Sequence, residues 1–367
     1  MNRKMYKEIA NPILSKMDSE TMHIGAREAL RMAESNPVTL KLLELFADQH
    51  KRFVDPRLNI VLAGIEFENP VMVGPGWDKP GGSEKALYAL GFSGVEVGGV
   101  LPEYQSGNKK PRQFMISEDV AINHLGLNGP GVNKVVERIK KYERAKERKN
   151  LRIGINVGQN NTTEPKDSPA AFATVVRETY PYADYFTLNP LCPNVENHDI
   201  PMEDVIEEVN ATMDSLGGIK PVFIKEGPDS LDQADRDIRL VKDYKLAGIV
   251  ATNTTTDTEI KAKYGKRWQN QPGGLSGNDP DFRKRSTKLI AHIRKQTHGE
   301  ISIIGAGGVH DWETALEKIE AGAQVIQIVT AIRGEGPAIA GKINRGLAEF
   351  MNREGIKNIG ELVGFTA

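Results

Sequence analysis

The sequence predicts an α/β fold, a (β/α)8 TIM barrel with an N-terminal helical extension. From Leu58 onward, short apolar runs alternate with amphipathic helical segments, and this unit occurs eight times. The runs are apolar throughout, which is typical of parallel strands covered on both faces. Glycine, asparagine, threonine or lysine follows each run, where the active sites of such barrels lie. Before Leu58 the apolar spacing is helical.

The helical extension is expected to form a unit of its own, at residues 1–56, followed by the barrel at 57–367. Residues 5–52 carry apolar positions at helical spacing, such as Ile9, Ile13 and Met17, with a break at Pro37. Two interpretations are open. The segment is either an arm that packs over one end of the barrel, or an apolar lid that receives a hydrophobic partner.

The barrel elements follow in order. Residues 58–71 are expected to form a small hairpin that closes the bottom of the barrel. Strands are predicted at 70–76, 93–100, 152–158, 184–190, 221–227, 247–255, 301–309 and 324–332. Helices are predicted at 81–91, 132–147, 169–183, 203–217, 231–247, 281–299, 312–323 and 337–355. A long polar connection through Asn128 separates the second strand from its helix.

Composition excludes several classes of function. The chain has 48 Lys and Arg against 49 Asp and Glu, so no global positive field recruits nucleic acid. The single cysteine excludes an intrachain disulfide, and no Cys/His spacing is that of a zinc site, so we expect no metal. No stretch approaches the roughly 18 apolar residues of a membrane-spanning helix.

The stretch Tyr185 to Asn194 is the strongest candidate for chemistry. It begins as an apolar strand and breaks at Asn189-Pro190, because proline cannot donate to a strand ladder. The only cysteine, Cys192, follows between two prolines and beside amides. It is therefore a candidate base or nucleophile, and the alternative is a buried thiol that packs as a small hydrophobic group.

Amides and glycines dominate the other strand ends. Asn123, Asn156, Asn189 and Asn253 can each donate and accept, which suits the edge of a pyrimidine or an isoalloxazine, although a single such Asn is more often a turn former. Two strand ends, the glycine-rich run GAGGV at 305–309 and the run QIVT at 327–330, close the seventh and eighth strands, where barrels often hold a phosphate. The motif GGLSG at 273–277 adds further backbone amides.

Lys225 ends the fifth strand and has two interpretations. A buried lysine of lowered pKa can form a Schiff base, as in a barrel lyase. A lysine can also stay a fixed cation beside a flavin ring, where it stabilises negative charge on the reduced cofactor. The position alone favours neither interpretation.

Taken together, the motifs resemble the dihydroorotate dehydrogenases from about Met17 to the C-terminus. The residues that carry the resemblance are the runs PGWDK, YALGFSGVEVGGV, GNKKPRQF, EDVAINHLGLNGPGV, GINVGQN, LNPLCPN, VFIKEGPD, VATNTT, GGLSG, IIGAGGV and IQIVTAI. The resemblance implies FMN-dependent oxidation of dihydroorotate to orotate in pyrimidine biosynthesis. It implies that Cys192 is the general base at C5 and that the hydride of C6 passes to flavin N5.

The resemblance also assigns binding residues. Those implied to line FMN are Pro75, Gly76, Gly99, Asn123, Asn156, Asn189, Lys225, Thr252, Ser276, Gly277, Gly308, Val329 and Thr330. Those implied to hold the substrate are Lys79, Asn123, His124, Leu125, Gly126, Leu127, Asn189, Asn194, Asn253 and Thr254.

The helical N-terminus and the lysine of PGWDK resemble class 2, the membrane-associated branch that passes electrons to quinone. The chain departs from that class in its base, because class 2 normally uses serine and cysteine belongs to the soluble class 1. Other departures are Pro190 and Leu191 before the base, and Met115, His124, Leu125 and Val329 near the class 2 quinone pocket. The expected acceptor is quinone, with the protein cytoplasmic or peripheral on the inner face of the cytoplasmic membrane through its N-terminal helices. The alternatives are a related flavoprotein that acts on another dihydropyrimidine or uses another acceptor, and a Schiff-base lyase using Lys225.

Overall fold

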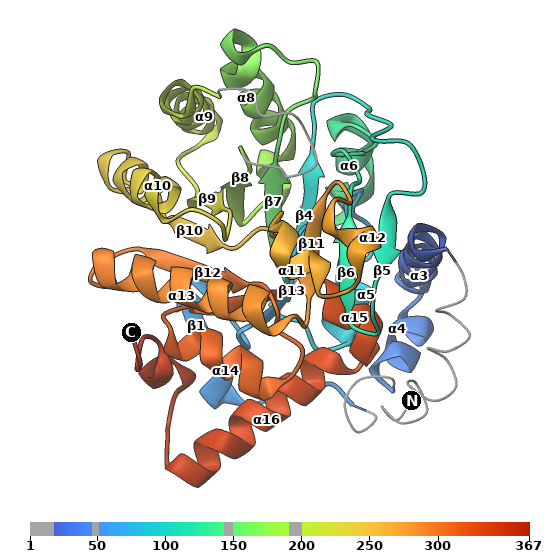
Figure 1. The fold of residues 1–367 in the computed structure, drawn as a ribbon, viewed down its shortest axis with the longest axis vertical. Helices are drawn as coiled ribbons and strands as arrows, with labels where there is room; N and C mark the ends of the chain where they lie inside the picture. The colour runs from blue at the N-terminus through green and yellow to red at the C-terminus, as the bar shows by residue number, and fades with distance from the viewer. Residues whose placement is uncertain (1–17, 46–50, 143–149, 191–199) are drawn as a thin grey trace.

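The computed structural model describes residues 18–45, 51–142, 150–190 and 200–367, and its centre is a closed parallel barrel (Figure 1). The strands neighbour one another in the order β10-β12-β13-β3-β4-β7-β8-β9. The predicted barrel is thereby confirmed. Its strands are β3 (Val71–Val73), β4 (Gly94–Val100), β7 (Arg152–Val157), β8 (Tyr185–Leu188), β9 (Val222–Glu226), β10 (Gly248–Ala251), β12 (Ser302–Ala306) and β13 (Val325–Ile328).

Helices surround these strands and bury their outer faces. The strands β3, β8, β9, β10 and β13 are buried at every residue. The covering helices are α5 (Glu84–Ala89), α6 (Val132–Ile139), α8 (Ser168–Thr179), α9 (Met202–Leu216), α10 (Leu231–Asp243), α13 (Pro280–Gln296), α14 (Trp312–Glu320) and α16 (Ile339–Glu354). Short 3-10 turns occupy Pro56–Leu58, Lys140–Tyr142, Pro165–Asp167, Tyr180–Tyr182 and Ile359–Leu362.

Helix boundaries follow from capping. The Asp279 side chain accepts from Phe282 N at the start of α13, where Pro280 fills the first position. The α16 helix ends at Glu354 and is capped by Gly355, which is in the left-handed conformation. The predicted eighth strand was too long, because β13 stops at Ile328 and Thr330 already begins a separate short helix, α15 (Thr330–Glu335).

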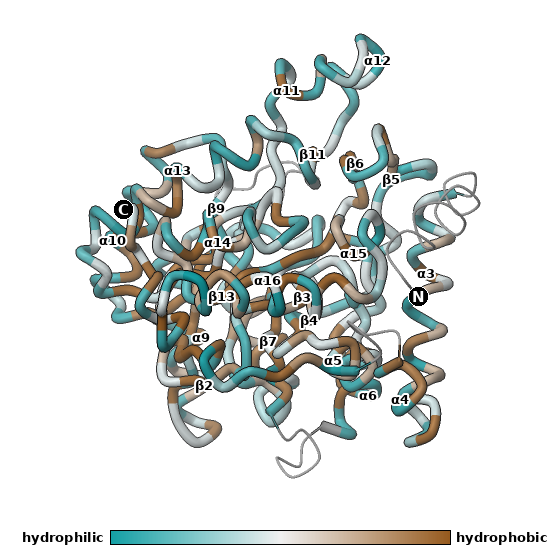
Figure 2. The backbone as a smooth tube through the Cα atoms, turned by 90° about the horizontal axis from the view of Figure 1, so that it is seen from below, coloured by the Kyte–Doolittle hydropathy of each residue, from teal (hydrophilic) through white to brown (hydrophobic). Residues whose placement is uncertain are grey.

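The expected hairpin is present as β1 (Ile60–Leu62) and β2 (Ile65–Phe67), which pair antiparallel. It meets the amino ends of the barrel strands, where Ala63 N donates to Ser302 Oγ at 3.2 Å. Figure 2 shows β2 at one end of the barrel, and β5, β6, β11, α11 and α12 at the opposite end.

The sequence did not predict a second sheet over the carboxyl end of the barrel. The supposed polar connection contains β5 (Gln113–Met115) and β6 (Val120–Asn123), and the insertion after β10 contains α11 (Thr258–Ala262), α12 (Lys266–Gln269) and β11 (Gly274–Gly277). The strands join in the order β11-β6-β5. A small core of Val120, Ile122, Ile260, Leu275 and Phe282 holds this sheet. Strands this short, from segments far apart in the sequence, show no readable alternation.

Two helices of the arm lie within the described residues, α3 (Ser19–Ala33) and α4 (Pro37–Glu44). Asp18 and Asn36 cap them by accepting from Thr21 N and Val38 N, each at 2.8 Å. Both helices pack beside α5, and α3 also contacts β5 (Figure 1). Across the described ranges, no helix is long and apolar enough to cross a membrane.

Candidate active site

A cavity of about 450 Å³ lies at the carboxyl ends of the barrel strands, under the β11-β6-β5 sheet and against α3. Its volume is in the range of small-molecule sites. It brings together most of the residues singled out from the sequence. These are Pro75, Gly76, Lys79, Gly99, Asn123, Leu125, Leu127, Asn156, Asn189, Lys225, Thr252, Asn253, Thr254, Ser276, Gly277, Gly308, Val329 and Thr330.

Four expected site residues are not placed on this lining. His124 and Gly126 lie behind it against Asn108, whose Nδ2 is 2.9 Å from His124 Nε2. Cys192 and Asn194 lie outside the described residues. Among the residues that are described, no group of three His, Cys, Asp or Glu side chains is arranged to hold a metal ion.

Two amides of the lining are linked to each other. Asn189 Nδ2 donates to Asn156 Oδ1 at 3.1 Å. Asn189 Oδ1 and Thr254 Oγ1 are buried, and neither has a hydrogen-bond partner in the described part of the chain. Because buried polar atoms in native proteins are almost always paired, these two atoms indicate a polar ligand in the cavity.

The end of β12 is rich in glycine and lies beside the end of β13. Gly308 has a φ of 80°, and a Cβ there would lie 2.5 Å from Arg283 Cβ, so only glycine fits. Across the same part of the cavity, Ser276 Oγ lies 2.9 Å from Thr330 Oγ1. Glycines and small hydroxyl side chains of this kind suit a phosphate, which backbone amides can approach closely.

Two lysines bring positive charge to the lining. Lys225 is buried on β9 with 7% exposure. Lys79 follows β3, and its Nζ donates to Asn128 Oδ1 at 2.8 Å. Among the described residues that line the cavity there is no carboxylate, so this part of the site suits an anionic, electron-rich ligand.

The far part of the cavity is apolar and belongs partly to the arm. Met22, Ala26 and Leu30 of α3 line it together with Met115 and Ile332. His23, also on α3, lies among them and was not identified from the sequence. Its Nε2 donates to Trp77 O at 2.6 Å, and burial lowers its pKa, so the imidazole is neutral near pH 7.

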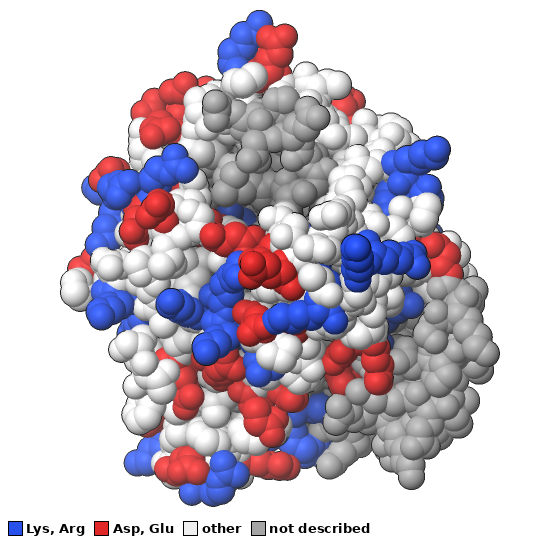
Figure 3. Space-filling model, in the orientation of Figure 1, with Lys and Arg blue, Asp and Glu red and all other residues white. Residues whose placement is uncertain are grey.

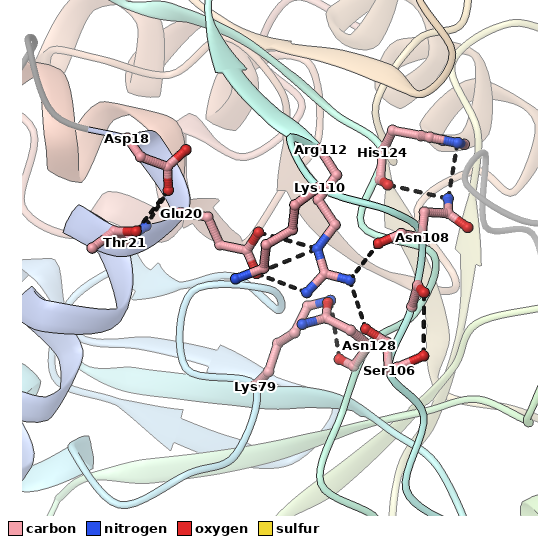
Figure 4. A network of polar contacts seen from close by, with 11 residues as sticks. Asp18, Glu20, Thr21, Lys79, Ser106, Asn108, Lys110, Arg112, His124 and Asn128 are labelled. Carbon is pink, nitrogen blue, oxygen red and sulfur yellow. Dashed lines mark hydrogen bonds and ion pairs between the residues drawn. The ribbon is translucent and has the colours of Figure 1, made fainter.

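A buried ion pair ties the arm to the loop that carries the expected substrate residues (Figure 4). Arg112 Nη2 donates to Glu20 Oε1 at 2.8 Å, and the two side chains are 7% and 8% exposed. Burial opposes ionisation of Glu20, but the hydrogen bond and charge of Arg112 lower its pKa overall. Arg112 Nη1 also donates to the carbonyls of Ser106 and Asn108, and Arg112 O accepts from His124 N at 2.7 Å.

Gln327 and Glu96 are further polar residues at this site that the sequence reasoning missed. Gln327 lines the cavity, and Glu96 lies directly below it in the barrel interior. The available signal was a single polar residue inside an otherwise apolar strand, in VEVGGV and QVIQIV. Such a residue is buried and must find a partner.

Comparisons with known proteins agree with this arrangement. The family model described as dihydroorotate dehydrogenase matches residues 57–351. A protein of Natronomonas pharaonis named dihydroorotate dehydrogenase (quinone) is 36% identical over 97% of this chain and 98% of its own. A protein of Christiangramia forsetii with the same name is 34% identical over 94% of this chain and 99% of its own. The crystal structure of the Eimeria tenella DHODH in complex with ferulenol superposes with a TM-score of 0.78 at 26% identity, over 90% of this chain and 95% of that one.

Proposed function

The chain belongs to the dihydroorotate dehydrogenase family, and on this premise we propose that it oxidises dihydroorotate to orotate with FMN as cofactor and quinone as acceptor. One observation carries the proposal. A single cavity joins an end built of amides, glycines and lysines to an apolar end completed by α3. Such a cavity suits two ligands of opposite character, a polar ring and a hydrophobic acceptor.

The lining fits FMN. The backbone amides near Gly308 and Thr330 would hold its phosphate, and acceptors without a described partner, such as Asn189 Oδ1, would meet its ring. Lys225 would place a cation beside the ring. The further residues proposed to line it are Pro75, Gly76, Gly99, Asn123, Asn156, Thr252, Ser276, Gly277 and Val329. When bound, FMN would supply the chemistry of accepting a hydride.

The substrate end would be built by residues of several strand ends. Lys79 and the amides of Asn123, Asn189 and Asn253 would bind the ring and its carboxylate. Cys192 would take the proton from C5, since a thiol with a pKa near 8.5 is partly ionised near neutrality. The further residues proposed here are His124, Leu125, Gly126, Leu127, Asn194 and Thr254.

The arm, with a boundary proposed at residue 56, would complete the acceptor site and bring it to a membrane surface. The α3 and α4 helices expose large apolar side chains, Ile24, Met32, Val38, Leu42 and Leu45. Elsewhere, on the face shown in Figure 3, acidic and basic side chains are interspersed and neither sign gathers into a large patch. Exposed apolar side chains on the arm support peripheral contact with lipid, from which a quinone would enter.

Turnover of the purified protein tests the proposal. We expect a yellow protein that reduces a soluble quinone analogue with dihydroorotate, and much more slowly with dihydrouracil. Preference for dihydrouracil would establish the alternative of another dihydropyrimidine. A colourless protein that is trapped on Lys225 by borohydride with a carbonyl substrate would contradict the proposal and establish a Schiff-base lyase.

A further inference from the structure

Glu96 is a buried carboxylate at the centre of the barrel. It lies on β4 with 0% exposure, and only uncharged side chains donate to it in the described structure. The donors are Asn156 Nδ2 at 2.8 Å to Oε1, and Tyr185 Oη at 2.9 Å, Thr187 Oγ1 at 3.1 Å and Gln327 Nε2 at 2.6 Å to Oε2. Since a carboxylate only accepts, every one of these groups must turn a donor toward it.

This requirement sets the direction of the amides above it. Asn156 points its NH2 group at Glu96, so its Oδ1 faces the other way and accepts from Asn189 Nδ2 at 3.1 Å. Asn189 in turn is left with its carbonyl oxygen, which is buried and unpaired among the described residues. The acceptor oxygens of Glu96 therefore determine which atom Asn189 presents, through one intermediate amide.

Gln327 follows the same rule from another strand. Its Nε2 is used by Glu96, and its Oε1 is buried without a partner in the part of the chain that is described. Asn156, Asn189 and Gln327 all line the cavity. Two side chains of the lining thus each carry a buried acceptor oxygen without a described partner, and a bound ligand with N–H groups would supply the missing donors.

We propose that Glu96 is a positioning residue, which orients Asn156, Asn189 and Gln327 so that the cavity presents acceptors and selects a ring bearing N–H groups. Glu96 itself touches no ligand and acts through the amides. The inference rests on the proposed function only for the identity of the ring. Both an isoalloxazine and a dihydropyrimidine carry an imide N–H between carbonyls, and the test separates them.

The test is Glu96→Gln, which keeps the shape and replaces one acceptor by a donor. If the new NH2 group faces Asn156, that amide must reverse, and Asn189 must reverse with it. If it faces the other donors, the hydroxyls can rotate but Gln327 must reverse. In both cases one acceptor at the cavity becomes a donor, and the affinity for a ring N–H falls by roughly tenfold or more.

Two probes measure this loss in the FMN-loaded protein. The dissociation of FMN on dilution reports the flavin ring, and titration with orotate reports the pyrimidine ring. Tyr185→Phe is the matched variant, because it removes a hydroxyl donor to Glu96 and leaves all three amides unchanged. The phenylalanine ring fits in the place of the tyrosine ring, which packs against Gly154. Glu226→Gln on β9 controls for the same change at another buried glutamate.

The inference is supported if Glu96→Gln weakens FMN or orotate binding while Tyr185→Phe and Glu226→Gln do not. It is overturned if Glu96→Gln leaves the affinities for FMN and orotate unchanged. It is also overturned if Tyr185→Phe lowers both affinities as much as Glu96→Gln does and lowers the Tm as well, because Glu96 then has only a structural role. If the wild-type protein binds neither probe, the proposed function fails instead. Amide directions in a neutron structure of the Glu96→Gln protein then decide the positioning role alone, and unreversed amides overturn it.

Discussion

At the scale of single residues, the site separates binding from proton transfer. The polar side chains that the structure places on the cavity are mainly amides, hydroxyls and lysines, and amides and hydroxyls do not act as bases near neutral pH. His23 is the exception, but it lies at the apolar end and its Nε2 donates a hydrogen bond to Trp77 O. A proton acceptor for the substrate must therefore come from elsewhere, which leaves Cys192 as the proposed base.

Substitution of Cys192 tests that role. We expect Cys192→Ala to bind FMN and orotate normally while flavin reduction by dihydroorotate falls by roughly 100-fold or more, the scale of a lost general base. Cys192→Ser should be intermediate, since a hydroxyl has a far higher pKa. The wild-type rate should rise with pH as the thiol ionises, and the serine variant should lose this dependence. Anaerobic stopped-flow absorbance across pH measures all three, and a near wild-type rate for the alanine variant removes Cys192 from the mechanism.

Thr330 offers a residue-scale test of the cofactor. It lies on the cavity beside Ser276, at the proposed phosphate end. Thr330→Glu would place a carboxylate against the phosphate, and we expect the purified protein to lose its flavin because two anions repel at short range. Thr330→Ser keeps the hydroxyl and should stay yellow. Flavin absorbance per protein measures both, and full retention by Thr330→Glu argues against this placement.

At the scale of elements, the arm is joined to the substrate loop as well as to the acceptor end. Arg112 is bound by Glu20 of α3 and at the same time holds the carbonyls of Ser106 and Asn108, next to His124 (Figure 4). Removing one partner of a buried ion pair leaves an uncompensated charge, which costs about 3 kcal/mol or more. Substitutions in α3 that break this ion pair should therefore alter the conformation of the loop that follows β6.

Glu20→Gln tests this connection. We expect a lower Tm and weaker orotate binding, because the loop from Asn123 to Leu127 loses its anchored neighbour. Glu28→Gln is the control on the same helix, since Glu28 pairs with Arg27 and Arg31 of α3 itself and not with the loop. Orotate titration and thermal melting measure both variants. Equal effects of the two substitutions would show that the arm affects orotate binding only through the stability of the whole protein.

Elements also divide into those that could and could not be predicted from sequence. The barrel strands are apolar runs with turn residues at their ends, so each one is readable alone. The sheet of β5, β6 and β11 is not, because its three strands gain stability only from partners in distant loops. The same holds for Glu96 and Gln327, whose meaning lies in a contact across the closed barrel. Most residues of the cavity lining could be predicted because they follow the ends of the barrel strands. The groups beneath the lining could be identified only from the structure.

At the scale of the whole molecule, stability depends on a buried acid pair outside the cavity. Glu226 on β9 and Asp237 on α10 are each 1% exposed. Burial, reinforced by the hydrogen bond and charge of Asp237, raises the pKa of Glu226 to about 10. Burial also raises the pKa of Asp237. Near neutral pH the folded pair therefore keeps a proton that the unfolded chain has released.

This pair sets a direction for the pH dependence of folding. A group whose pKa is raised on folding stabilises the protein fully below its unfolded pKa, and this stabilisation is lost as pH rises toward the folded pKa. Between pH 6 and 9 the free energy of unfolding should fall by at most about 1.4 kcal/mol per pH unit from this proton. Glu226→Gln donates to Asp237 permanently and should flatten that slope, whereas Glu208→Gln, exposed on α9, should keep it. Urea unfolding across this pH range measures the slopes, and an unchanged slope in Glu226→Gln would mean that the pair is not the group that titrates.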